Sequence, residues 1–281
     1  MLEFISDSLT NQVVEQTPGN LRRIFWFPTG PFRFLPVHAA GLYGDQYTEP
    51  GHKASDFVVS SYVPNLTLLA CHTQPGSVSV GGGDLRLLAV RQPSSDGQPQ
   101  LQDVDIELEH IRTVIQNSPS ARATLVEPSL GTVEDVLELM QVTDWVHFAR
   151  QGIQDSKFPG DSRLCLADQR HLKLSDIISV SRPRSGLAFL SACQTATGHT
   201  VLSDVAAGML FAGYRGVISA MWSIHDRLAP SVTKDVYEQL FRNDTLPDCC
   251  EAARALHDAM GRFRDSNASF VEWVPFIHVG L

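Results

Sequence analysis

The feature that most constrains the fold of this chain is the alternation of short apolar runs with longer segments of helical periodicity. The runs suited to central strands are residues 85–90, 145–149, 187–192 and 217–221. Helical spacing or capping signals mark residues 104–115, 132–140, 206–215, 228–241 and 248–263, and a last strand is expected at 274–279. Such alternation predicts a mostly parallel sheet with helices on both faces. The nearly all-apolar run 187–192 is typical of a strand that is covered on both sides.

The charge balance limits the classes of partner. The 281 residues include 22 Lys and Arg against 31 Asp and Glu, for a net charge of -9. This balance argues against a nucleic-acid binder, whose affinity comes largely from basic residues on phosphates. Apolar stretches are too short to span a bilayer, and the first residues do not have the pattern of a signal peptide. We therefore expect a soluble, cytoplasmic protein that binds neither nucleic acid nor membrane.

The five cysteines do not form a recognisable framework. Their count is odd, and the spacings of Cys71, Cys165, Cys193, Cys249 and Cys250 fit neither a zinc site nor regular disulfides. Adjacent Cys249 and Cys250 are expected on a helix rather than bridged to each other. We predict no metal and no cofactor.

A glycine-rich stretch at residues 76–83 divides the chain in the prediction. Residues 1–83 would form an N-terminal lobe, with strands at 24–28 and 56–62, and residues 84–281 a second lobe with the βα alternation. Because Gly81-Gly82-Gly83 precedes a strand, whereas a phosphate-binding loop follows its strand, a nucleotide-binding reading is set aside.

Two strand ends are the expected location of any chemistry, because sites in open α/β sheets lie at the carboxyl ends of the central strands. Arg150-Gln151-Gly152 follows the strand at 145–149, and Cys193-Gln194-Thr195 follows the strand at 187–192. A cysteine in such a position is by itself more often a small buried apolar residue than a nucleophile.

The residues around these ends resemble the CHAT domain family, in its fungal type. One family block ends a strand in His-Gly and is similar to residues 145–152, and a second carries the nucleophilic cysteine and is similar to residues 190–196. Further similar blocks, in the same order, are residues 27–40, 207–218, 221–226 and 273–277. The resemblance implies a caspase-like three-layer α-β-α fold with a mostly parallel central sheet, related to caspases, separases and gingipains.

The resemblance also implies a Cys/His dyad, in which histidine takes and returns the proton. Carried over by position, Cys193 is the nucleophile and Gly152 the oxyanion-binding backbone. Gln151 occupies the position of the histidine. Asp155 and Gln194 are candidate substrate-binding residues, although Asp155, like Asp161, is also typical of a solvated loop carboxylate.

Gln151 bears directly on whether the chain is an enzyme. A glutamine amide neither accepts nor returns a proton near neutral pH, and an unassisted thiol is only about 3% thiolate at pH 7. His199 and His225 are possible substitutes from nearby loops. His147 shares the side of Gln151 by strand parity but lies about 13 Å back, so we expect it to be a hydrogen-bonded residue of the sheet.

The leading hypothesis is a catalytically impaired pseudo-peptidase that binds a peptide or protein. A tetratricopeptide module is a possible partner, because CHAT domains often follow such repeats, and this chain would then be one piece of a longer protein. The alternative is an active cysteine endopeptidase that uses Cys193 with His199 or His225.

Overall fold

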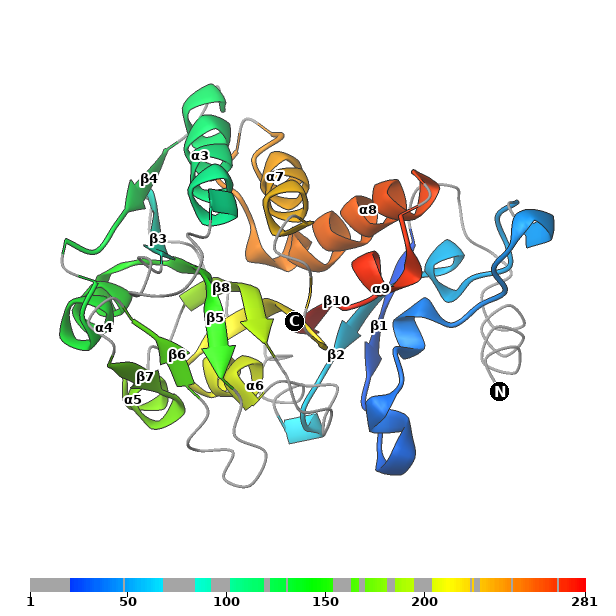
Figure 1. Cartoon of the computed structure of the whole chain (residues 1–281), viewed down its shortest axis with the longest axis horizontal. Helices are drawn as coiled ribbons and strands as arrows, with labels where there is room; N and C mark the ends of the chain where they lie inside the picture. Colours follow the sequence, from blue (N-terminus) through cyan, green and yellow to red (C-terminus); the bar gives the residue numbers. More distant parts are fainter. Residues whose placement is uncertain are drawn as a thin grey trace.

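The computed structural model describes residues 21–47, 49–67, 84–91, 102–118, 122–129, 131–153, 163–166, 170–180, 185–194, 204–222, 224, 228–243, 245–266 and 268–281. At residues 102, 150–153, 163, 165, 185, 192–194 and 204 it describes the backbone alone. Within this part of the chain, a ten-stranded sheet lies between two groups of helices, as Figure 1 shows. The expected three-layer α/β architecture is confirmed.

The main path of the sheet runs β1-β2-β10-β9-β8-β5-β3-β4, with β6 and β7 joined to it through β5. All pairs along this path are parallel except β10 with β9, and the β5–β6 and β6–β7 pairs are antiparallel. The strands are β1 (Arg22–Trp26), β2 (Val58–Tyr62), β3 (Leu85–Arg91), β4 (Ala123–Val126), β5 (Trp145–Ile153), β6 (Arg163–Cys165), β7 (His171–Lys173), β8 (Ser185–Gln194), β9 (Tyr214–Ala220) and β10 (Phe276–Gly280).

The helices cover the two faces of the sheet as separate layers. One apolar cluster joins the sheet to α3 (Gln102–Asn117), α7 (Ala229–Leu240) and α8 (Ala252–Asp265). The other joins it to α4 (Val133–Val142), α5 (Leu174–Ser179) and α6 (Asp204–Phe211). A short α9 (Phe270–Trp273) precedes β10, and single 3-10 turns lie at Gly30–Phe34, Val37–Ala39, Asp45–Tyr47, Ala54–Asp56 and Cys249–Glu251.

Strand β8 shows why its sequence is almost entirely apolar. Leu187 and Phe189 belong to the cluster under α3, α7 and α8, whereas Ala188 and Leu190 belong to the opposite cluster. Alternate side chains of a strand point to opposite faces, so both faces of β8 are buried. This burial does not depend on any residue of the predicted dyad.

Local signals placed some helix boundaries correctly and missed others. The Thr132 hydroxyl accepts a hydrogen bond from the Asp135 backbone N–H at 3.2 Å, which confirms the predicted cap of α4. The predicted helix at 206–215 is wrong at its end, because α6 stops at Phe211 and Tyr214 already begins β9. Gly213, at φ 107°, makes the turn between them. Similarly, the predicted strand at 274–279 begins only at Phe276, after α9.

The N-terminal strands belong to the same sheet as the rest of the chain. β1 and β2 form a parallel pair, and β2 is joined to β10 through the register pair Val279 and Tyr62. The proposed boundary between residues 83 and 84 adjoins residues 68–83, which lie outside the described part. The division into lobes 1–83 and 84–281 therefore stays a prediction.

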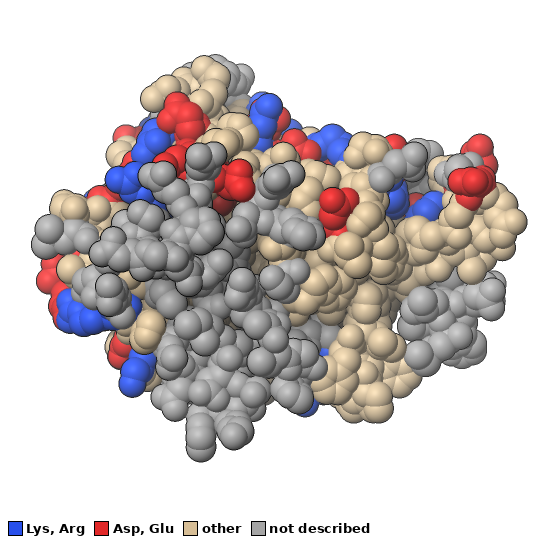
Figure 2. Space-filling model, viewed as in Figure 1, with Lys and Arg blue, Asp and Glu red and all other residues tan. Residues whose placement is uncertain are grey.

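Charges of both signs are interspersed over α3 and α4 on the face in Figure 2. Arg112 of α3 pairs with Glu109 at 3.2 Å and with Glu127, and Arg170 pairs with Glu134 of α4. Such exposed pairs contribute little to stability. They do place carboxylates on Arg112 and Arg170, which reduces the attraction of these two side chains for a phosphate backbone.

Candidate active site

The two predicted strand ends lie side by side, at the carboxyl ends of two central strands. β5 and β8 are parallel neighbours that end at Ile153 and Gln194. In register, Gln151 pairs with Ala192, Gly152 with Cys193, and Ile153 with Gln194. The backbone therefore brings residues 151 and 193 onto adjacent strands, one register position apart. The chemical roles assigned to Cys193, Gln151 and Gly152, and the substrate-binding role of Gln194, stay predictions.

The last part of β5 is separated from the first by a register shift. Phe148 pairs with Leu190, but Gln151 pairs with Ala192, so β5 takes three steps where β8 takes two. An extra residue of this kind interrupts the alternation of sides along a strand. Counting parity from His147 to Gln151 is therefore not valid across the shift, and the statement that these two residues share a side stays a prediction.

The backbone of Gly152 has a neighbouring strand on each side. It is in register with Cys193 of β8 and, across β5, with Leu164 of the short antiparallel strand β6. β6 continues through register pairs with β7, so a small hairpin borders the end of β5. Residue 152 is thus interior to the sheet rather than at a free strand edge.

His147 is a structural residue, as predicted. Its Nε2 lies 3.1 Å from Glu107 Oε1, and its Nδ1 lies 3.3 Å from the Tyr237 hydroxyl. Thr233 donates a further hydrogen bond to the same Glu107 oxygen. Burial raises the pKa of Tyr237 well above its usual value, so its hydroxyl keeps the proton that it can donate. All four side chains are buried, and they tie β5 to α3 and α7.

Several residues that were considered for the site lie outside the described part of the chain. These are His199, His225, Asp155, Asp161 and Cys71. Of the described histidines, His147 lies on β5 but is hydrogen-bonded within the core, as above.

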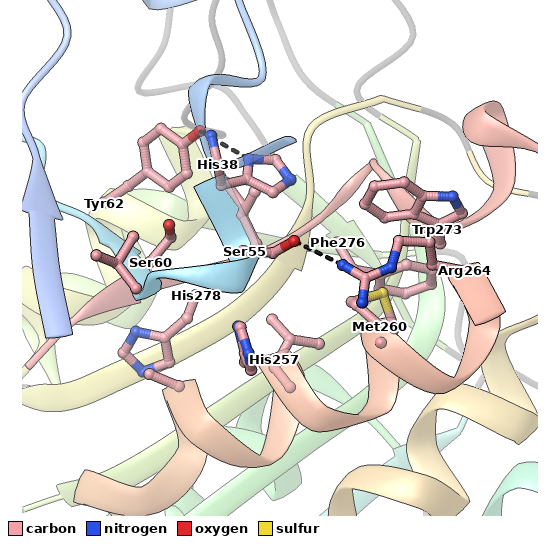
Figure 3. Close-up of a pocket in the computed structure, with 15 residues that line it drawn as sticks. His38, Ser55, Ser60, Tyr62, His257, Met260, Arg264, Trp273, Phe276 and His278 are labelled. Carbon is pink, nitrogen blue, oxygen red and sulfur yellow. Dashed lines mark hydrogen bonds between the residues drawn. The ribbon is translucent and has the colours of Figure 1, made fainter. Parts of the chain in front are cut away.

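A cavity of about 50 Å³ was not anticipated from the sequence (Figure 3). It lies between β2, α8, α9 and β10, and no residue of β5 or β8 is among those that line it. Its described walls combine apolar side chains with His38, Ser55, His257, Arg264 and His278. Its residues come from segments some 200 positions apart, so no local motif could have revealed it.

The histidines of this cavity are held in their neutral form. Burial lowers the pKa of His38 to about 4, although the Val274 carbonyl at 3.0 Å from Nε2 acts in the other direction. His278 is buried, and its pKa is well below the usual value because of burial and the nearby Arg23 guanidinium. Arg23 lies 3.1 Å from His278 Nδ1 and can only donate, so Nδ1 accepts and the proton resides on Nε2.

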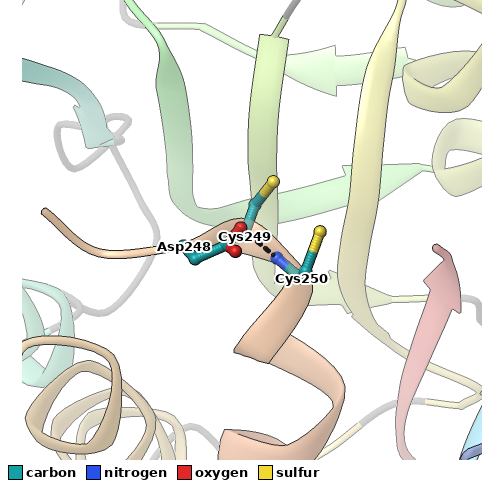
Figure 4. A group of neighbouring side chains, drawn as sticks. All are labelled: Asp248, Cys249 and Cys250. Atoms are coloured by element: carbon teal, nitrogen blue, oxygen red, sulfur yellow. Dashed lines mark hydrogen bonds between the residues drawn. The ribbon is translucent and has the colours of Figure 1, made fainter. Parts of the chain in front are cut away.

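Potential metal ligands come together at one place in the described residues. Donor atoms of Asp248, Cys249 and Cys250 lie within 4.8 Å of one another (Figure 4). The 3-10 turn that carries the cysteines contacts β9, and Arg215 near these cysteines lies at the start of β9, in line with the start of β8 and not with its carboxyl end. It is therefore separate from the predicted dyad, and the expectation of no metal and no cofactor stays a prediction.

Membrane insertion through a helix has no support in this part of the chain. Among the helices of the described residues, none combines the length and the apolar character needed to cross a bilayer.

Solved structures with a similar fold include a separase complex and gingipains. The separase of Saccharomyces cerevisiae, in complex with securin, matches 80% of this chain at 14% identity and a TM-score of 0.51. This chain covers only 14% of that separase chain. The complex of the pro- and mature domains of RgpB from Porphyromonas gingivalis matches the whole chain at 10% identity, with a TM-score of 0.57 and 69% of that chain covered. The Arg-specific proteinase gingipain R is similar, at 9% identity, a TM-score of 0.56, and coverage of 100% and 67% of the two chains.

These identities are low, so the likeness shows the fold alone. No curated protein sequence matches the chain. The model of the CHAT domain family, in contrast, matches residues 2–281, which is nearly the entire sequence. The chain, with its caspase-like α/β fold, therefore belongs to the CHAT domain family.

Proposed function

We propose that this chain is a CHAT-domain pseudo-peptidase that binds a peptide or protein at the ends of β5 and β8. The observation that carries the proposal is the residue at position 151. It lies beside the strand of Cys193, where the family places its proton carrier, and it is a glutamine.

The chemical argument starts from the thiol. Attack on a peptide requires a thiolate, and cleavage requires a proton for the leaving amine. The Gln151 amide supplies neither, and loss of a positioned acid–base group removes about two to four orders of magnitude in rate. Peptide hydrolysis by Cys193 should therefore be very slow.

The position of Gly152 supports the same conclusion. An oxyanion hole needs a backbone N–H that is free to point at the substrate. Within a strand, N–H and C=O groups point toward the neighbouring strands. Since Gly152 is flanked by Cys193 of β8 and Leu164 of β6, its N–H is better placed for the sheet than for a tetrahedral intermediate.

A protein or peptide is the partner class that we favour. Two of the structural neighbours are complexes, of separase with securin and of the RgpB pro-domain with its mature domain. The interspersed charges of Figure 2 and the net charge of -9 do not suit nucleic acid. A tetratricopeptide module remains our proposal for a neighbouring domain. The free thiols Cys249 and Cys250 favour the reducing cytoplasm.

Restoring the histidine tests the catalytic half of the proposal. The natural chain should not turn over a fluorogenic peptide library. Gln151→His should gain about 10²-fold or more in cleavage rate if the missing base is the sole fault, and it should stay silent if the Gly152 N–H is also held by the sheet. The double variant Gln151→His with Cys193→Ser is the matched control, and it should be silent. Labelling with an acyloxymethyl-ketone probe gives a second readout.

The opposite result would establish the rival function. If the natural chain cleaves peptides and Cys193→Ser abolishes that cleavage, the protein is an active peptidase. His199→Gln and His225→Gln, each made separately, would then identify which histidine replaces the missing base.

Binding at the strand ends is tested with two substitutions at one position. Peptides selected from a displayed library should bind the natural chain and Cys193→Ser with similar affinity in fluorescence polarisation. Cys193→Trp, which puts a much larger side chain at the position in register with Gly152, should weaken binding at least tenfold. Equal binding by Cys193→Ser and Cys193→Trp, with unchanged melting temperatures, would place the peptide elsewhere and refute the proposed site.

A further inference from the structure

The cavity between β2, α8, α9 and β10 has a buried floor and a more exposed mouth. At the floor, Val58 is 0% exposed, Tyr62 1% and Phe276 3%. The residues of the mouth all keep partial exposure, and they are Ser55, His257, Gly261 and Arg264. Within the described part of the chain, solvent therefore reaches the cavity from the side of these four residues.

One side of α8 supplies most of the mouth. The cavity residues of this helix recur three or four positions apart, and they are Ala253, Leu256, His257, Met260, Gly261 and Arg264. Residues with this spacing lie along one stripe of a helix. Figure 3 shows the side chains of His257, Met260 and Arg264 on the side of α8 that faces the cavity. A substitution along this stripe therefore acts on the cavity directly.

Gly261 is a residue that the fold itself does not require. It lies inside α8, where glycine destabilises a helix relative to alanine. A Cβ at this position would meet nothing within 4 Å, and the backbone is not in the left-handed region that favours glycine. The effect of the missing side chain is to leave open space at the mouth of the cavity.

Two polar groups at the mouth have hydrogen-bonding capacity that the described residues do not use. His257 forms no hydrogen bond with another described residue. Arg264 donates from Nη1 to the Ser55 hydroxyl at 2.6 Å and from Nε to Asp265 at 3.2 Å, but its Nη2 has no such partner. Burial lowers the pKa of His257, so its neutral ring offers one donor and one acceptor.

The charge of Arg264 is already balanced. Asp265 pairs with its Nε, and Asp56 lies 3.8 Å from its Nη1. An anion at the mouth would meet these two carboxylates, and a cation would meet the guanidinium. An uncharged acceptor, such as a carbonyl oxygen, is therefore the group that suits Arg264 Nη2.

The polar groups near the floor are paired within the fold. The Tyr62 hydroxyl lies 2.8 Å from His38 Nδ1, and the Ser60 hydroxyl accepts a hydrogen bond from Trp26 at 2.9 Å. His278 directs its Nε2 toward Gly216 of β9. What remains at the floor is an apolar surface, which favours an apolar occupant.

The volume limits the size of this occupant. A cavity needs about 10–15 Å³ for each water molecule, so about 50 Å³ has room for about three to five non-hydrogen atoms. This is the size of one valine, leucine or isoleucine side chain. Benzene occupies a cavity of about 150 Å³, so an aromatic side chain is too large.

The length of the mouth indicates what carries that side chain. His257 and Arg264 are seven positions apart, which corresponds to about 10 Å along a helix. A small molecule that fills the cavity is too short to contact both residues. An extended peptide rises about 3.3 Å per residue, so about three residues cover this length.

We propose that the cavity is a docking site for an extended, uncharged peptide segment of a partner protein, whose central valine, leucine or isoleucine side chain enters the cavity. A backbone carbonyl of the segment accepts a hydrogen bond from Arg264, and a backbone N–H donates one to His257. No residue of β5 or β8 lines the cavity. The proposal is therefore independent of the peptide site at the ends of those strands.

The experiment observes the full chain by NMR, with ¹³C in the methionine methyl groups. Met260 lines the cavity, and Met260→Leu identifies its signal. The probe is the capped peptide acetyl-Gly-Leu-Gly-amide, which should shift the Met260 signal to saturation. The counterpart with alanine in the centre should bind about tenfold more weakly or worse, because it buries much less apolar surface. The counterpart with phenylalanine should also bind more weakly, because its ring does not fit.

Variants at the mouth separate docking from general effects on the fold. Gly261→Leu should abolish the shift, because its side chain occupies the open space, while the melting temperature should not fall, since leucine is a better helix former. Arg264→Met keeps an apolar stem but no donor, and it should weaken binding about threefold or more. Cys193→Trp is the matched control at the other proposed site, and it should bind the peptide as the natural chain does.

Four results would overturn the proposal. The first is a Met260 signal that does not respond to acetyl-Gly-Leu-Gly-amide, and the second is equal affinity for the leucine and alanine peptides. The third is unchanged binding by Gly261→Leu, or binding that is lost in Cys193→Trp, which would assign the peptide to the ends of β5 and β8 instead. The fourth is equally tight binding of isobutyramide, which has a branched apolar group but no flanking residues and would identify a small-molecule site.

Discussion

The two halves of β5 have opposite relations to histidine chemistry. In the first half, His147 is buried and hydrogen-bonded to Glu107 and Tyr237. In the second half, beyond the register shift, the position expected to carry a catalytic histidine holds Gln151. One strand thus keeps a histidine where it supports the core and lacks one where it would support chemistry.

The difference teaches that the fold and the dyad are separable in this chain. The first half pairs with β3 and β8 and packs into both apolar clusters, and none of these contacts involves residue 151. A substitution at the strand end can therefore remove a proton carrier without a matching loss of stability. His38 and His278 extend the comparison, since their side chains too are hydrogen-bonded to other parts of the fold. We call a histidine with such a structural role a framework histidine.

The largest effect on stability is expected from Glu107→Ala. It leaves His147 Nε2 and the Thr233 hydroxyl buried without their acceptor. A buried polar group that loses its hydrogen-bond partner costs about 1–3 kcal/mol; two such groups lose their acceptor here, so urea unfolding should show a loss of several kcal/mol. Glu109→Ala, on the same helix but exposed, should change stability by less than about 0.5 kcal/mol. Similar losses in the two variants would mean that His147 is not a framework residue.

Acid should destabilise the fold through His38. The pKa is lowered to about 4 in the folded protein and is about 6.5 in the unfolded chain, so the unfolded state binds more protons between these values. Stability is therefore retained above pH 6.5 and lost as pH falls toward 4. The contribution of His38 between pH 7 and pH 5 is about 2 kcal/mol.

The matched measurement is the same pH series on His38→Gln. Its free energy of unfolding should fall less between pH 7 and pH 5 than that of the natural chain. An identical pH dependence would show that His38 is not held neutral by burial.

A smaller effect is expected where a framework histidine meets a glycine. A Cβ at Gly216 would lie 2.7 Å from His278 Nε2, so Gly216→Ala must displace the buried ring. The steric overlap destabilises the folded state, whereas alanine loses less backbone entropy than glycine on folding. The net decrease in the free energy of unfolding should be about 1 kcal/mol, measured by thermal unfolding. Gly261→Ala in α8 meets nothing within 4 Å and should be neutral or slightly stabilising. A Gly216→Ala protein of unchanged stability would argue against tight packing of His278.

Sequence patterns predicted the central strands because burial on both faces leaves a continuous apolar run. The start of α4 was predictable for a similar reason, since Thr132 and Asp135 interact locally. The end of α6 was predicted wrongly, but it could have been predicted correctly, because Gly213 is a typical helix-terminating residue. The short strands β6 and β7 could not be predicted from the sequence. Each has three residues, too few to show a periodicity, and their pairing depends on the end of β5.

For the candidate site, the positions were predictable but their relation was not. Two strand ends with Gln151 and Cys193 could be read from apolar runs and their flanking residues. The register shift depends on how β5 aligns with β8, which no local pattern encodes. For this reason parity cannot relate the side of His147 to that of Gln151, whereas the structural role of His147 was correctly predicted.

The junction between β2 and β10 has a consequence for how the molecule assembles. Ser61 and His278, hydrogen-bonded across it, are 217 positions apart, and the strands share one register pair. Bringing these two strands together closes a long loop, which costs chain entropy. The contacts that offset this cost form only after both strands are in place. We expect docking of the β1–β2 ribbon to be a late and slow event in folding, and its release to be an early one in unfolding.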